Sequence, residues 1–178
     1  GGASLSPSTT CPPPNSWAGN VDVLWTGAGG PGNVNYHFGT IQVCAGGPPT
    51  CIHVITGCDV LPGISWSFGS APSGWSATLH NDSGMLTPAG PASNPIPPTF
   101  WDGWICVAAA ASVPNGATSC VNLNLTCGDQ TSVITVCSSG AWKPTSSKSI
   151  KICSHASTPS GSWASSVETR NLRVAAPD

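Results

Sequence analysis

Glycine and proline interrupt this chain so often that a long helix has no room to form. The 178 residues include 21 Gly and 18 Pro, and both residues disfavour helix interiors. Between them, hydrophobic and polar residues alternate over short runs, as in Val21, Val23 and Trp25. A period of two is typical of strands with one buried face. We therefore predict an all-β chain.

The predicted strands are spaced as in a β-sandwich, either a jelly roll or an immunoglobulin-like fold. They cover residues 20–26, 33–38, 40–44, 51–56, 63–68, 74–81, 104–111, 119–127, 131–138, 149–154 and 165–175. A slip in the alternation at Gly39 predicts a β-bulge, and the proline-rich stretch 82–99 predicts a surface loop. A division into two domains near 82–103 is the alternative, but each half would be short of core.

The chain divides into three predicted parts. Residues 1–19 form an extended N-terminal arm, in which three consecutive prolines favour polyproline II. Residues 20–164 form the sandwich, and residues 165–178 form a C-terminal strand or tail. This tail is either the last strand of its own sheet or a strand added to a neighbouring subunit. The N-terminal arm is the other candidate donor.

Cysteine usage predicts disulfide bonds and an oxidising, extracellular location. The nine cysteines are Cys11, Cys44, Cys51, Cys58, Cys106, Cys120, Cys127, Cys137 and Cys153. Their spacing contains no zinc-type Cys-x-x-Cys pair, so we predict no metal and no cofactor. The start at Gly1 fits a removed export signal or a tag remnant. About four disulfides are expected, which leaves one cysteine over, and Cys11 in the arm is the first candidate for it.

One pairing can be excluded from strand geometry. Seven residues of strand between Cys120 and Cys127 span about 23 Å, whereas the Cα atoms of a disulfide lie about 5.5 Å apart. Each of these two cysteines therefore needs a partner on another strand or loop.

Charge is scarce. Charged residues make up 7% of the chain, against about 25% in a typical domain. Five Lys and Arg residues and a net charge of −2 do not provide the basic face that nucleic acids require. No apolar run reaches the roughly 18–20 residues of a transmembrane segment. A charge-poor surface suits a protein that packs against copies of itself or carries covalent glycans, and an ordinary neutral secreted domain is the alternative.

Two features indicate carbohydrate. Asn81 and Asn124 begin N-x-S/T sequons, and both are predicted to project to solvent, as N-glycosylation requires. Trp101, Asp102 and Trp104 lie in a predicted Gly-containing turn, where at least one exposed indole and the carboxylate could hold a sugar ring. The alternative is that these two tryptophans cap one end of a core filled by other tryptophans.

Catalysis has little support in the sequence. Glycosidases place two carboxyl groups on either side of the bond that they cleave. The few acidic residues here offer only pairs such as Asp59 and Asp102, and no motif distinguishes such a pair from the others. No G-x-S-x-G nucleophile motif is present. We therefore predict that the protein is not an enzyme.

Three motifs lie between residues 72 and 138. Residues 72–79 (PSGWSATL) are similar to the strand entry of bacterial extracellular immunoglobulin-like modules. Residues 104–107 (WICV) then lead through 114–116 (PNG) to the Cys-x6-Cys strand, and a Thr-rich strand ending in Val136 and Cys137 follows. Together these motifs resemble secreted microbial surface and filament proteins built from sandwich domains. The resemblance implies a sandwich fold and an extracellular structural or adhesive role, and it implies no catalytic residue.

These observations lead to ranked hypotheses. The first is a structural subunit of an extracellular filament or cell-surface assembly, a homopolymer formed by strand donation. The second is a secreted carbohydrate-binding or adhesin domain, and the third is a small secreted hydrolase.

Overall fold

The computed structural model describes residues 11, 12, 17–25, 29–84, 86–142, 148–153 and 167–172. These residues form twelve strands and no helix, so the prediction of an all-β chain is confirmed. Within this part of the chain no helix is long and apolar enough to cross a membrane.

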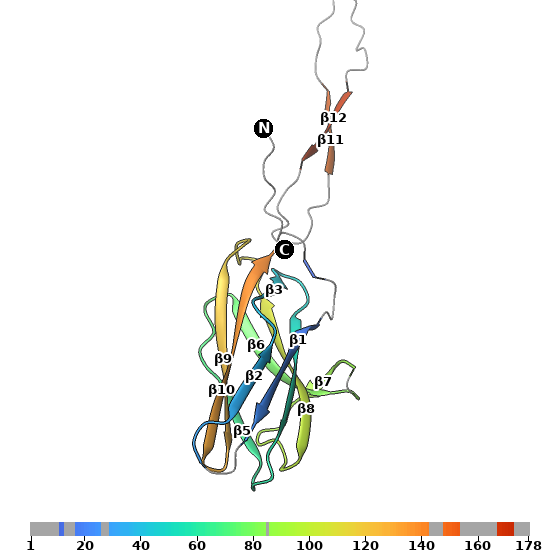
Figure 1. Ribbon diagram of the computed structural model, residues 1–178. Coiled ribbons are helices and arrows are strands. Elements are labelled where there is room, and N and C mark those ends of the chain that lie inside the picture. The colour runs from blue at the N-terminus through green and yellow to red at the C-terminus, as the bar shows by residue number, and fades with distance from the viewer. Residues whose placement is uncertain are drawn as a thin grey trace, which may run out of the picture.

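Ten strands form two facing sheets (Figure 1). The six-stranded sheet has the order β2 (Asn33–His37), β1 (Trp17–Leu24), β4 (Thr50–Gly57), β8 (Phe100–Ala109), β6 (Trp75–Asp82) and β7 (Pro88–Pro91). The four-stranded sheet has the order β3 (Ile41–Cys44), β10 (Gln130–Ala141), β9 (Thr118–Cys127) and β5 (Ile64–Phe68). Pairing is antiparallel except between β1 and β4 and between β3 and β10.

The core lies between the two sheets and follows the alternation of the sequence. Every second residue of β9 and β10 is buried over most of their length, because successive side chains on a strand point to opposite faces. Fully buried aliphatic residues come from both sheets: Val21, Ile52, Val54, Ile105, Val107, Leu123, Leu125 and Ile134. Trp75 belongs to this core, whereas Trp25 and Trp66 are partly buried at its margin.

The predicted runs all overlap observed strands, but three local predictions are wrong. The stretch 82–99 contains the short strand β7. Strand β8 begins at Phe100, so the predicted turn around Gly103 is continuous strand. The slip at Gly39 is no bulge, because β2 belongs to the six-stranded sheet and β3 to the other. The phase changes there because the chain crosses from one side of the core to the other.

Four disulfides staple the sandwich, as the number of cysteines predicted. Cys58–Cys127 joins the end of β4 to the end of β9 and so links the two sheets. Cys51–Cys106 and Cys120–Cys137 each join directly opposed residues of neighbouring antiparallel strands. Cys120 and Cys127 have different partners, as strand geometry required. These bonds place the folded chain in an oxidising environment.

The prediction that Cys11 is the odd cysteine is wrong. Cys11 bonds to Cys44 at the end of β3, which ties the N-terminal arm to its own sandwich. Residues 17–19 of the predicted arm already belong to β1. The four bonds use eight of the nine cysteines, and the side chain of the ninth, Cys153, lies outside the part of the chain whose side chains the structure describes.

The last two strands stand apart from the two sheets of the sandwich. Strand β11 (Lys148–Cys153) pairs with β12 (Val167–Leu172) as an antiparallel, two-stranded sheet. The sequence placed residues 149–154 in the sandwich, but the sandwich strands end at Ala141. The segment 167–172 is therefore a strand of its own small sheet in this structure.

Candidate functional site

The outward face of the six-stranded sheet gathers most of the ionisable side chains of the sandwich. His53, His80 and Trp104 occupy one row across β4, β8 and β6, and Asp102 lies two residues before Trp104 on the same face. The outward face of the four-stranded sheet differs: β9 and β10 expose Asn, Thr and Val there, with no charged residue. The two faces of the sandwich are therefore chemically distinct.

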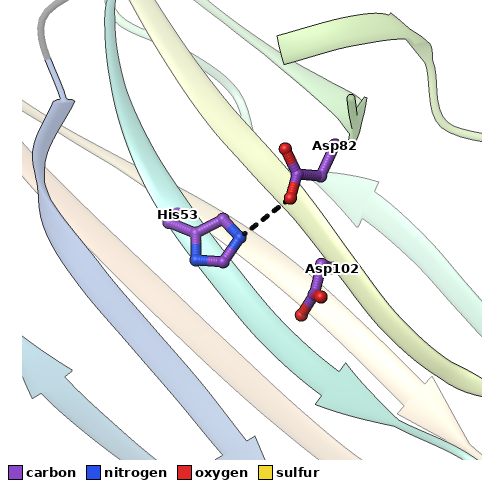
Figure 2. A group of neighbouring side chains, drawn as sticks. All are labelled: His53, Asp82 and Asp102. Carbon is purple, nitrogen blue, oxygen red and sulfur yellow. Dashed lines mark ion pairs between the residues drawn. The ribbon is translucent and has the colours of Figure 1, made fainter. Parts of the chain in front are cut away.

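Three side chains converge on this face from three adjacent strands (Figure 2). His53 comes from β4, Asp82 from the end of β6, and Asp102 from β8. One ligand-type atom of each lies within 4.8 Å of the other two. His53 Nε2 is 3.5 Å from Asp82 Oδ2, and the two side chains are only 6% and 4% exposed. The sequence separates these residues widely, and strand pairing brings them together.

Hydrogen bonds orient the Asp82 carboxylate. Its Oδ1 accepts hydrogen bonds from Trp104 Nε1 at 2.9 Å and from the backbone N–H of Leu86 at 3.1 Å. Its Oδ2 faces His53, and among the residues that the structure describes neither Oδ2 nor His53 Nε2 has a hydrogen-bond partner. One edge of the carboxylate is thus satisfied by the protein, and the other is held toward the imidazole.

Aromatic rings and a disulfide shield the cluster from water. The His53 ring centroid lies 4.7 Å from that of Trp104, which is fully buried. The Trp17 ring covers that of Trp104, with the two ring centroids 5.4 Å apart, and Trp17 is itself 61% exposed. Trp104 also packs with the Cys51–Cys106 disulfide as a small apolar cluster separate from the main core. Polar atoms here lie in a low-dielectric environment, where electrostatic interactions are strong.

This arrangement is suited to holding a cation more than to covalent chemistry. Two carboxylates and an imidazole can bind a metal ion or share a proton. A glycosidase instead needs an open site between its two carboxyl groups, and the Asp82 side chain is buried. Asp59, which the sequence offered as a partner of Asp102, lines a different cleft.

The residues predicted to hold a sugar do not form an exposed platform. Trp101 and Trp104 are 8% and 1% exposed, so the prediction that at least one indole is exposed is wrong. They point to opposite faces, because Trp101 packs in the main core whereas Trp104 packs on the outer side. Residues three apart on a strand point to opposite faces. Gly103 leaves room for the Trp101 ring, which a Cβ at that position would overlap. Asp102 shares the outer face with Trp104.

The two sequon asparagines differ in their surroundings. Asn81 is partly buried; its Oδ1 accepts a hydrogen bond from Trp101 Nε1 at 3.0 Å, and its Nδ2 donates to the carbonyl of Pro91. A glycan on that Nδ2 would compete with its hydrogen bond to Pro91. Asn124 is exposed in the middle of β9, as a glycan acceptor must be. Occupancy of Asn124 stays a prediction.

A cleft of about 580 Å³ opens at one end of the sandwich. It lies at the ends of β1 and β4 and the start of β8, and its walls include the apolar side chains of Leu24, Ile55 and Phe100. Leu24 is 56% exposed and Phe100 is 74% exposed. Asp22 and Asp59 add carboxylates to the lining. It is an apolar, acidic cleft with large hydrophobic side chains open to solvent.

Sequence reasoning missed His53, Asp82 and Trp17. Residues two apart on a strand share a face, so reading 100–104 as strand would have kept Asp102 with Trp104 and separated both from Trp101, but it would not have indicated the three missed residues. The order of strands in the sheet, which brings β4 and β6 to either side of β8, had no signal in the sequence.

The comparisons with known proteins identify no relative. The chain matches no family model, no curated protein and no solved structure. The resemblance of residues 72–138 to microbial surface modules therefore stays a prediction.

Proposed function

We propose that this protein is a non-enzymatic structural subunit of an extracellular assembly. In this assembly the segment that follows β10, residues 142–178 and from here on called the tail, binds the end cleft of the next copy. The observation that carries this proposal is that the cleft and the origin of the tail lie at opposite ends of the sandwich and are complementary in charge. The exposed apolar cleft, the disulfides and the scarcity of charge are all consistent with such a role.

The positions of the two ends follow from strand pairing. Ala141, where β10 ends and the tail begins, pairs with Cys44, and the following Ala45 bridges Ala109 at the end of β8. The cleft lies at the other end of β8, around Phe100. Figure 1 shows that β1 and β10 run in opposite directions, so that their last residues lie at opposite ends of the sandwich. When a surface at one end of each copy binds a different surface at the opposite end of the next copy, the contact can repeat from copy to copy. If the repeat does not close into a ring, it produces a fibre.

Acidic and basic residues are also separated along the chain, most of the first in the sandwich and all of the second in the tail. Residues 1–142 contain five Asp and no Lys or Arg, whereas all five Lys and Arg residues lie at position 143 or beyond. The tail also alternates cationic and aliphatic residues, as in Lys148, Ile150, Lys151 and Ile152. An apolar cleft with two aspartates is a complementary surface for such a segment.

Insertion of a strand into the sandwich is less well supported than binding in the cleft. Tyr36 Oη accepts a hydrogen bond from the backbone N–H of Thr135 at 2.9 Å, which closes an open part of the β10 edge. At β5, the Asn94 side chain bonds both the N–H and the C=O of Trp66. Side chains thus occupy edge groups that a donated strand would need. In this proposal the tail therefore binds the cleft and adds no strand to β5 or to the open part of β10.

Replacing Phe100 with serine is expected to weaken association of copies by about tenfold, because a large exposed aromatic at the centre of an interface contributes strongly to affinity. Phe100 is 74% exposed, so its loss should cost the fold little. Light scattering over a concentration series measures the effect.

Val133→Ser is the matched control. Val133 is 45% exposed on the outward face of the other sheet, and its replacement should leave assembly unchanged. Lys148→Gln with Lys151→Gln should also weaken association, whereas arginine at both positions should preserve it. Unchanged assembly in Phe100→Ser and in the glutamine variant would refute the proposal.

Trp17 supports carbohydrate binding as a second candidate function. Its ring is 61% exposed and lies beside Trp104 on the outward face, close to His53. An exposed indole can stack on a sugar ring while nearby polar groups meet its hydroxyls. A glycan array should then show binding that Trp17→Ala abolishes and Trp17→Phe partly retains. Binding that is equal in the wild type and Trp17→Ala would exclude this site.

A further inference from the structure

The cluster of His53, Asp82 and Asp102 contains buried polar atoms that its surroundings do not satisfy. His53 Nε2 and Asp82 Oδ2 have no hydrogen-bond partner within the described part of the chain, and their side chains are more than nine-tenths buried. Burying such groups without compensation costs free energy, and buried charges are normally paired or coordinate a metal. The two atoms point toward each other at 3.5 Å, which is long for a hydrogen bond.

The spacing of these atoms suits a shared ion. Ligand atoms about 2.1 Å from a tetrahedral ion lie about 3.4 Å apart, close to the observed 3.5 Å between His53 Nε2 and Asp82 Oδ2. The third ligand-type atom, from Asp102, lies within 4.8 Å of both. Figure 2 shows the three side chains grouped about one point on the sheet.

We propose that His53, Asp82 and Asp102 bind one divalent transition-metal ion, with zinc the best match to the donors. Imidazole nitrogen and carboxylate oxygen are zinc ligands, whereas calcium takes oxygen ligands alone. Three protein ligands leave a fourth position for water or an exogenous group. The ligands come from three strands, so the spacing of these residues in the sequence does not predict the site.

Charge balance is consistent with this assignment. Two carboxylates and a neutral imidazole around a divalent cation sum to zero, so the ion would compensate the charge of both carboxylates. An uncompensated charge is costly in such surroundings. The hydrogen bonds from Trp104 Nε1 and Leu86 N–H to Asp82 Oδ1 also correspond to the outer contacts that orient metal-binding carboxylates.

The test is a titration of the full chain carrying Cys153→Ser, which removes a competing thiol. Calorimetry with zinc chloride should give one ion per chain, cobalt should give the visible absorption of a low-symmetry N/O site, and zinc should raise the melting temperature. His53→Gln and Asp102→Asn should each weaken zinc binding at least about tenfold.

His37→Gln provides the matched control. His37 Nε2 lies 3.2 Å from Asp22 Oδ1 on the same face of the sheet, but this pair is exposed, and its loss should leave zinc affinity unchanged. Circular dichroism establishes that each variant is folded, and Asp102→Asn provides the test if His53→Gln is not.

Three results would each overturn the proposal: no saturable zinc binding, equal affinity in folded Asp102→Asn, or calcium binding as tight as zinc. None of them bears on whether the tail binds the end cleft, because the cluster and the cleft share no residue.

Discussion

Replacing both Cys58 and Cys127 with alanine is expected to lower the free energy of unfolding by about 4 kcal/mol. This disulfide links the two sheets and closes a loop with a sequence separation of 69 residues. In the chain-entropy account, a cross-link stabilises by restricting the unfolded chain, more so for longer loops. Both cysteines are also buried, so their truncation removes packing atoms from the core. Urea denaturation measures the change.

The Cys120–Cys137 disulfide provides the comparison for this prediction. Its sequence separation is 17 residues, which corresponds to about 3 kcal/mol, and Cys120 is exposed, so that less packing is lost. Alanine at both of these positions should therefore be the milder change. If it destabilises the protein as much as loss of Cys58–Cys127, the role assigned to the inter-sheet bond is wrong.

Gly103→Ala is expected to destabilise the protein by about 3 kcal/mol, as overpacking of a core does. A Cβ at this position would overlap the ring of Trp101 and crowd the carbonyl of His80 at 2.6 Å. Displacing the ring would also break the hydrogen bond from Trp101 Nε1 to Asn81 Oδ1. Thermal and urea unfolding measure the loss.

Gly39→Ala is the matched control, because nothing lies within 4 Å of a Cβ built there. Gly39 connects β2 to β3, and its replacement should change stability by about 0.5 kcal/mol or less. Near-wild-type stability of Gly103→Ala would show that the Trp101 ring moves aside at little cost. Gly103 would then not be required for the buried position of the Trp101 ring.

The candidate site shows where prediction from the sequence stops. Asp102 and Trp104 were singled out because aromatic and acidic residues gather there, and Asp102 does belong to the cluster on the outward face. Trp101 was grouped with them because a glycine between aromatics is typical of a turn. Here the glycine lies within a strand and accommodates a neighbouring ring, which is a tertiary packing effect.

The cysteines give a parallel case. Their number predicted about four disulfides, and strand length excluded a bond between Cys120 and Cys127. The actual partners depend on which strands are neighbours and on how the arm returns to β3, as the Cys11–Cys44 bond shows. Many pairings satisfy the same spacing, so the sequence did not distinguish among them.

The sequence by itself determined the all-β class, nearly all the strands and the scarcity of charge, because alternation, backbone restriction and composition are read directly from the residues. Only the tertiary structure decided the strand order, the disulfide partners, the end cleft and the meeting of His53 with Asp82 and Asp102. These depend on contacts between segments far apart in the chain. The free energy of such contacts comes from burial and packing in three dimensions, which local patterns do not specify.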